Sequence, residues 1–315
     1  MGDFPSQVNV QPAPAVAGDF CNTNPRNTVD AGPGGLVAGP AGVTIGLFAW
    51  LANSFFDVNS APQVANNFGT GLPAGFVHRE QQGLITQYLQ ASGTLIPAGF
   101  MVTLFASGGF WVANAGTNEV VPGMKAYAAF ATGAITFAAT GTPTTGSFTG
   151  SIGAATASFT GSISGNVLTV TAVSAGTLVA GASLSGGSGI VATSQITAQL
   201  TGTTGGIGTY QVNIAEQTVP AAALTATYGI LTVTGTVTGG TLGVGQTLTG
   251  SGVAANSYIT QLGTGAGGAG TYYVSPTQTV GSITTTFAAN IETKWFARSG
   301  GLPGELIKMD SASYG

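Results

Sequence analysis

Hydrophobic and polar residues alternate with a period of two along much of this chain, and no long stretch shows the spacing of an amphipathic helix. The alternation is clear in LTVTAV (168–173) and LTVTGTV (231–237), where Leu and Val share one side of the chain. β-Branched Thr and Val favour the pleated backbone, and Gly-Gly or Ser-Gly pairs interrupt the runs roughly every eight to twelve residues. The pattern predicts an all-β protein of strands joined by glycine-rich turns.

Local patterns outside that region predict individual strand pairs. The run LIPAGFMVTLFASGGFWVANAG (95–116) alternates as two strands would that turn at Gly108-Gly109. The next run, AYAAFATGAITFAAT, predicts another pair that turns at Gly133. Near the end, ETKWFARSG (292–300) predicts a strand with Lys, Phe and Arg on one side, and GLPGELIKM (301–309) predicts a turn and a final strand.

The middle of the chain repeats itself. LTVTAVSAGTLVAGASLSG (168–186) matches LTVTGTVTGGTLGVGQTLTG (231–250), and GGIGTYQV further on matches GGAGTYYV, with an offset that falls from 63 to 61 residues. A shorter echo links GSFTGSI (146–152) to ASFTGSI (157–163). A near-constant period with length changes in glycine-rich stretches is typical of repeated structural units. We therefore predict small β-sandwich-like modules over about 164–228 and 229–286.

Charge divides the chain into two compositions. It has 6 Lys and Arg and 10 Asp and Glu, which is 5% of 315 residues, and a net charge of −4. Between Lys125 and Glu292, the only charged residue is Glu216. The contrast predicts one domain formed by 1–144 plus 287–315, interrupted by an inserted β-repeat region over 145–286. A string of consecutive domains is the alternative.

The same composition bears on function. With one His and one Cys, His78 and Cys21, the chain cannot form an internal disulfide or a Cys/His metal cluster, and the repeats lack the Asp ligands of a calcium-binding β-roll. His78-Arg79-Glu80 is the most polar cluster, but it has no companion nucleophile and indicates a structural or interface role. We expect no enzyme activity, cofactor or metal. Few cations indicate no nucleic-acid partner, and short apolar stretches indicate no membrane partner.

The first twenty residues predict an extended arm. They contain prolines, which restrict the backbone to extended or turn conformations, and apolar residues spaced along the chain. Such a segment can lie along a neighbouring protein and add strand-edge hydrogen bonds. A disordered tail is the alternative. The residues on which this prediction depends are Phe4, Pro5, Val8, Val10, Pro12, Pro14, Val16 and Phe20.

Both chain ends resemble the structural cement, or head decoration, proteins of tailed bacteriophages. The resemblance rests on DFPSQVNVQPAPAVAGDF (3–20), AGPGGLVAGPAGVTIGLFAW (31–50), GFVHREQQGLIT (75–86), the turn from Pro122 to Lys125, and ETKWFA with PGELIKM near the end. It implies a β-rich protein that coats the assembled capsid and holds capsomers together without catalysis. It also implies that the repeats are a variable, outward-facing addition.

From this resemblance we expect binding to the major capsid protein on the outer surface of the virion, after assembly in the host cytoplasm. We also expect a homo-oligomer, either a dimer or a trimer. The expected capsid contacts are the eight arm residues together with Arg26 and Arg79. The alternative is an adhesive module or fibre component whose repeats bind host-surface glycans, with Tyr210, Tyr258, Tyr272 and Tyr273 as candidates for stacking on sugars.

Overall fold

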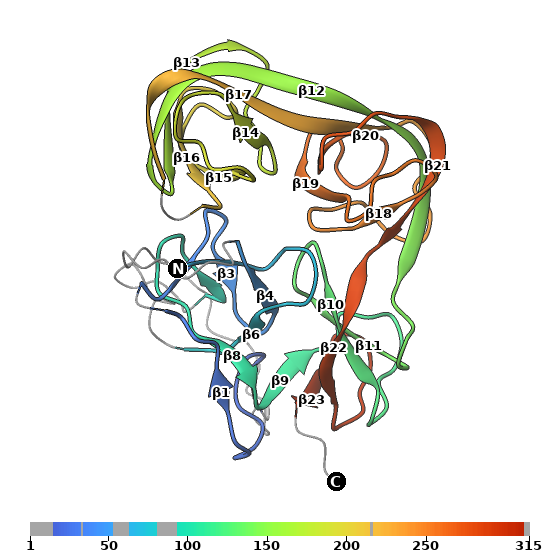
Figure 1. Ribbon diagram of the computed structural model, residues 1–315. Coiled ribbons are helices and arrows are strands. Elements are labelled where there is room, and N and C mark those ends of the chain that lie inside the picture. The colour runs from blue at the N-terminus through green and yellow to red at the C-terminus, as the bar shows by residue number, and fades with distance from the viewer. Residues whose placement is uncertain (1–14, 33, 53–62, 81–92, 215–216, 312–315) are drawn as a thin grey trace, which may run out of the picture.

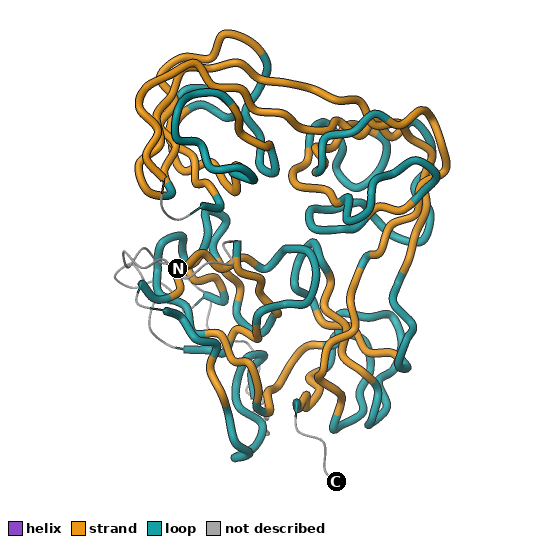
Figure 2. The backbone as a smooth tube through the Cα atoms, viewed as in Figure 1, coloured by secondary structure: helices purple, strands orange, loops and turns teal. Residues whose placement is uncertain are grey.

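The computed structural model describes residues 15–32, 34–52, 63–80, 93–214 and 217–311. These residues form strands, turns and loops and contain no helix, as Figure 2 shows. The predicted all-β class is confirmed. The chain forms a body at one end, from β1 to β11 with β22 and β23, and a repeat region at the other, from β12 to β21 (Figure 1).

Two sheets make up most of the body. The first has the order β1-β8-β6-β4-β5-β2, and its strands are β1 (Asn27–Thr28), β2 (Leu36–Ala38), β4 (Phe48–Leu51), β5 (Gln63–Asn66), β6 (Gly75–Val77) and β8 (Leu104–Ser107). The second has the order β11-β10-β22-β23-β9, and its strands are β9 (Gly109–Ala113), β10 (Lys125–Ala129), β11 (Ile135–Ala138), β22 (Asn290–Ala297) and β23 (Leu306–Asp310). A separate pair joins β3 (Val43–Thr44) to β7 (Leu95–Ile96). The two chain ends therefore contribute to one sheet.

One predicted strand pair is confirmed and another is wrong. β10 pairs with β11 across the turn at Gly133, as expected. β8 and β9 do not pair with each other: β8 pairs with β1 and β6, and β9 pairs with β23. The chain passes from one sheet to the other at Gly108, where φ is 135°, a conformation that glycine tolerates. A side chain at Gly109 would overlap Asn22, so the second glycine serves close packing.

An aromatic cluster fills the space between the two body sheets. Phe48 and Phe76 come from the first sheet, and Phe110 and Trp295 come from the second; all four side chains are buried. The ring centres of Phe76 and Phe110 lie 4.5 Å apart, and those of Phe48 and Trp295 lie 6.0 Å apart. Because only alternate residues of each strand face inward, the opposite face of the second sheet is left outside this core.

Two long strands carry the repeat region. β12 (Thr145–Gly165) and β17 (Gln217–Val233) pair from Gly150↔Val233 to Gly165↔Gln217 and run as neighbouring ribbons across the top of Figure 1. Shorter strands join them in a ten-stranded sheet. These are β13 (Val167–Ala175), β14 (Ser183–Ser185), β15 (Ile196–Gly202), β16 (Gly208–Val212), β18 (Leu248–Thr249), β19 (Tyr258–Leu262), β20 (Gly270–Ser275) and β21 (Val280–Ala288).

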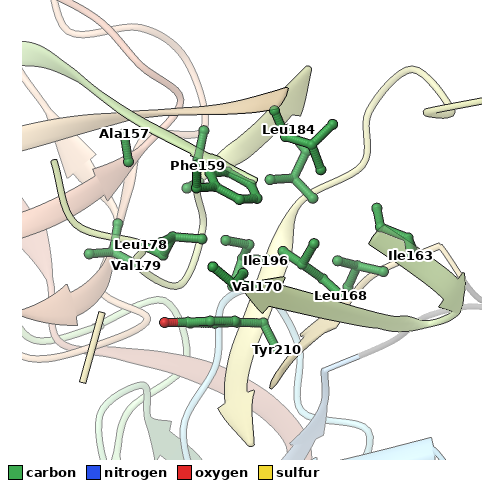
Figure 3. Packing of buried hydrophobic residues seen from close by; sticks show 14 of the residues in the cluster. Ala157, Phe159, Ile163, Leu168, Val170, Leu178, Val179, Leu184, Ile196 and Tyr210 are labelled. Atoms are coloured by element: carbon green, nitrogen blue, oxygen red, sulfur yellow. The ribbon is translucent and has the colours of Figure 1, made fainter. Parts of the chain in front are cut away.

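The repeat region has two separate hydrophobic clusters. The first contains Phe159, Ile163 and Leu168, and Figure 3 shows these side chains packing around Val170 and Tyr210. The second contains the residues that match them in sequence, including Phe148 and Leu231. The echo in the sequence thus has a structural meaning, because the first half of β12 serves the second cluster and its second half serves the first. Along the chain, the second cluster begins with the first half of β12 and continues with the second half of β17. All buried residues of the first cluster lie between these two segments.

Candidate functional site

The N-terminal segment, residues 15–24, lies along the edge of the second body sheet. The Gly18 amide donates to the Trp111 carbonyl at 2.7 Å, and the Trp111 amide donates to the Asp19 carbonyl at 2.8 Å. The side-chain amides of Asn22 and Asn24 donate to the carboxylate of Asp310 at 2.8 and 2.9 Å. Because Asp310 is fully buried on β23, these bonds tie the N-terminal segment to the last strand.

Phe20 anchors this segment in the body. Its ring stacks on His78, with the ring centres 3.9 Å apart, and packs against the edges and faces of Phe105 and Phe110. The guanidinium carbon of Arg26 lies 3.6 Å from the centre of the Phe20 ring on a cation–π contact. Sequence reasoning did not anticipate this cluster, because its members come from three distant parts of the chain, around residues 20–26, 78 and 105–110.

His78 supports the anchor as a neutral side chain. Its Nδ1 lies 2.7 Å from the Gly18 carbonyl, and since a carbonyl only accepts, Nδ1 carries the proton. Burial lowers the pKa of His78 below its usual value of 6.5, although the bond to Gly18 and the nearby Glu80 and Asp19 oppose that shift. The His78 ring therefore binds the backbone of the N-terminal segment at Gly18, and no nucleophile is among its described partners.

Cys21 is an unreactive thiol at the same edge. Its Sγ lies 3.9 Å from the Met309 carbonyl, to which the thiol donates. Burial, followed by the negative charge of Asp310, raises the pKa of Cys21 to about 11. A thiol with so high a pKa is almost entirely protonated at neutral pH and is a poor nucleophile.

The predicted capsid contacts fall into two groups. Six of them lie outside the described residues: Phe4, Pro5, Val8, Val10, Pro12 and Pro14. Of the others, Val16 is 45% exposed, whereas Phe20 and Arg26 pack on each other. Arg79 pairs with Asp19, with its Nη1 3.6 Å from the carboxylate. A role for any of the ten in capsid binding stays a prediction.

A second candidate surface lies on the outer side of the second body sheet. Four of the chain's six cations point there, three from strands β10, β22 and β23 and one from the bend that follows β22, and two half-buried aromatic rings lie among them. We call this set the cationic face: Trp111, Lys125, Lys294, Phe296, Arg298 and Lys308. The sequence predicted that Lys294, Phe296 and Arg298 share one side. It contained no local signal that Trp111 and Lys308 would lie beside them.

A polar clasp joins the body to the repeat region. The Glu292 carboxylate accepts from the Gly141 amide at 2.7 Å and from the Tyr127 hydroxyl at 3.0 Å, and Lys125 Nζ lies 4.0 Å away. These donors lower the pKa of Glu292, with the Gly141 amide as the largest cause. Since Gly141 precedes β12 and Glu292 follows β21, the clasp holds together the two strands that enter and leave the repeat region.

The repeat region presents an uncharged surface. Its described residues include no Asp, Glu, Lys, Arg or His. Tyr210 and Tyr272 occupy matching places in the two clusters, and their hydroxyls donate to the carbonyls of Gly206 and Gly268 at 2.6 and 2.7 Å. Both rings are buried, at 1% and 0% exposure, so neither is placed to stack on a sugar.

Between body and repeat region lies a cleft of about 270 Å³ whose described lining includes Trp50, Gln195 and Thr260. None of the described lining residues has an ionisable acid, base or thiol side chain that would serve as a general acid, base or nucleophile at neutral pH. Within the described part of the chain, no group of three or more His, Cys, Asp or Glu is placed to hold a metal ion, and no helix is long and apolar enough to cross a membrane.

The fold defines an all-β protein with a two-sheet body and a repeat region. Comparison with known families identifies which one: residues 4–179 match the family described as structural cement protein (E217 gp24/Pam3 gp6). The chain belongs to this family of phage structural proteins, so the predicted resemblance is confirmed. Membership implies association with the capsid of the virion. No curated protein and no solved structure matches the chain.

Proposed function

We propose that this chain is a non-enzymatic cement protein that binds the outside of the assembled phage head. Its partner is the major capsid protein, and it bridges neighbouring subunits of the shell, as a dimer or trimer assembled in the host cytoplasm. The observation that carries the proposal is the anchored N-terminal segment. Residues 1–17 come before the first backbone bond to β9, and a chain of that length spans about 55 Å when fully extended. That length would be enough for contact with a neighbouring subunit of the shell.

The distribution of charge supports one orientation on the head. All described charged residues belong to the body, whereas the described repeat region has none and lies at the other end of the molecule (Figure 1). A charged end suits specific contact with another protein, since complementary charge sets register and excludes wrong partners. An uncharged end suits exposure to solvent with little dependence on salt. The body therefore faces the shell in this proposal, and the repeat region projects outward.

Removal of residues 2–15 tests the arm while it leaves the pairing of Gly18 and Cys21 with β9 in place. The binding partner is heads assembled without this protein, and the bound amount is measured by co-sedimentation. We expect the deletion to abolish stable binding, because repeated strand-edge and apolar contacts are lost at every site.

A matched control replaces residues 2–15 by a Gly/Ser segment of equal length, which keeps the chain length and removes the side chains. It should bind as poorly as the deletion. Occupancy equal to that of the intact protein in both variants would reject the arm as the capsid contact. A melting temperature close to that of the intact protein shows that the body remains folded.

A further inference from the structure

We propose that the cationic face docks on an acidic protein surface at the outside of the head shell. This inference rests on the proposed function, and it adds a second contact, on a different surface from the arm. The face consists of Trp111 on β9, Lys308 on β23, Lys294 and Phe296 on β22, Arg298 directly after β22, and Lys125 on β10.

Strand register brings these side chains together. Lys308 pairs with Trp111, and Lys125 pairs with Phe296, so the members of each pair point to the same side of the sheet. The Arg298 amide donates to the Lys308 carbonyl at 2.7 Å, which continues the row across the sheet. The alternate residues Trp295, Ala297 and Met309 point into the core. Packing on the core side therefore holds the backbone of this face rigid.

The charge of the face is positive although the whole chain carries −4. Two carboxylates, those of Glu292 and Asp310, lie on this side of the sheet, and each is bound to hydrogen-bond donors. Glu292 is bound to the Gly141 amide, the Tyr127 hydroxyl and Lys125 at the end nearest the repeat region. Asp310 is fully buried beneath Asn22 and Asn24. Lys294 and Lys308 are exposed on this face, and Arg298 is half-buried beside them.

The aromatic rings order the cations in advance. Lys308 Nζ lies 5.2 Å from the centre of the Trp111 ring, and Arg298 Cζ lies 4.2 Å from the centre of the Phe296 ring. A cation held over a ring loses less side-chain freedom when a partner binds. Tryptophan and arginine are also enriched in the residues that dominate protein–protein interfaces. These features favour a protein surface as the occupant.

Two other occupants fit less well. In a twofold contact between copies of this chain, the same patch meets itself, which would bring like charges together. Nucleic acid is bound mainly through many phosphate contacts, and the face offers only four cations on a chain of net negative charge. Acidic side chains of a shell protein match both the sign and the small number of charges.

The test reverses charge at the two exposed lysines in the double variant Lys294→Glu/Lys308→Glu. The control is Lys294→Arg/Lys308→Arg, which keeps the charge at the same positions. Binding to heads assembled without this protein is measured at about 50 mM and about 300 mM NaCl, between which the screening length falls from about 14 to about 6 Å. At the lower salt, we expect the reversal to weaken binding about tenfold or more and the control to bind like the intact protein.

Each alternative has its own outcome. Equal binding by the reversed variant and the intact protein at both salt concentrations would overturn the inference. Binding that nuclease treatment abolishes would assign the face to nucleic acid, and a change only in the sedimentation of the protein alone would assign it to self-association. If the intact protein itself does not bind heads, the result rejects the proposed function, and this inference is rejected with it. Unchanged thermal unfolding of both variants excludes misfolding as the cause.

Discussion

Replacement of Phe20 by alanine should release the N-terminal segment from the body. Phe20 is half-buried, stacks on His78, packs against Phe105 and Phe110, and lies under the guanidinium of Arg26. The backbone bonds between residues 18–21 and β9 remain possible in the variant. The aromatic contacts that hold this segment against β9 are lost.

The size of the effect follows from burial. Truncation of a fully buried Phe to Ala costs about 3 to 5 kcal/mol, and half-burial reduces this to about 1.5 to 2.5 kcal/mol. Since about 1.4 kcal/mol corresponds to a factor of ten, local opening of the segment should become about 10 to 60 times more frequent. Phe20→Leu keeps apolar volume without the ring contacts, so it should have a smaller effect of about 1 kcal/mol.

Hydrogen exchange measures this opening directly. The amides of Gly18, Cys21 and Trp111 donate across the pairing, so their exchange should accelerate by the factor given above where the rate follows the opening equilibrium. The Leu184 amide, which donates to the Ser194 carbonyl at 2.8 Å in the repeat region, is the internal control. Unchanged exchange at the three amides would show that the aromatic cluster does not anchor the segment.

Three further outcomes follow from other contacts. Because burial lowers the pKa of His78, the unfolded chain binds more protons, so the free energy of unfolding should fall as pH drops below about 6.5. His78→Gln should remove that dependence in unfolding curves at several pH values. Phe148→Ala and Phe159→Ala should each lower the free energy of unfolding by about 3 to 5 kcal/mol. Hydrogen exchange should increase around β20 in the first variant and around β16 in the second. An equal increase around both strands in either variant would contradict two separate clusters. The pKa of Glu292 is lowered, so its carboxylate stabilises the fold above about pH 4.5 and less below it. Glu292→Gln should therefore melt with a weaker dependence on pH between about 6 and 3.5, and identical slopes would argue against the clasp.

Local patterns were sufficient for the strands but not for all their partners. The pair at Gly133 was predictable because both strands and their turn are adjacent in the chain. The same reasoning placed β8 and β9 together at Gly108, where it was wrong. β9 pairs instead with β23, almost two hundred residues away, and with residues 18–21. Two neighbouring strands pair only if no distant strand makes better contacts, and their own residues do not reveal such a competitor.

The internal matches show the same division. Equivalent residues were visible from the offset, and both Tyr210 and Tyr272 are buried with the same kind of hydroxyl bond. The matches did not reveal that Phe148 and Phe159, eleven residues apart on one strand, enter different clusters. That assignment depends on how β12 and β17 align over their whole length. The division into independently folding domains stays a prediction.

The candidate surfaces depended most on distant contacts. The cationic face gathers residues from four segments between Trp111 and Lys308, and the Phe20 anchor gathers residues from three distant parts of the chain. The all-β class, the internal matches and the cement-protein resemblance came from residue patterns, because alternation, turn residues and motifs are encoded by neighbours in the chain. Sheet order, the two interleaved clusters and the grouping of cations came from folding, because these features arise only when strands far apart in the chain pack together.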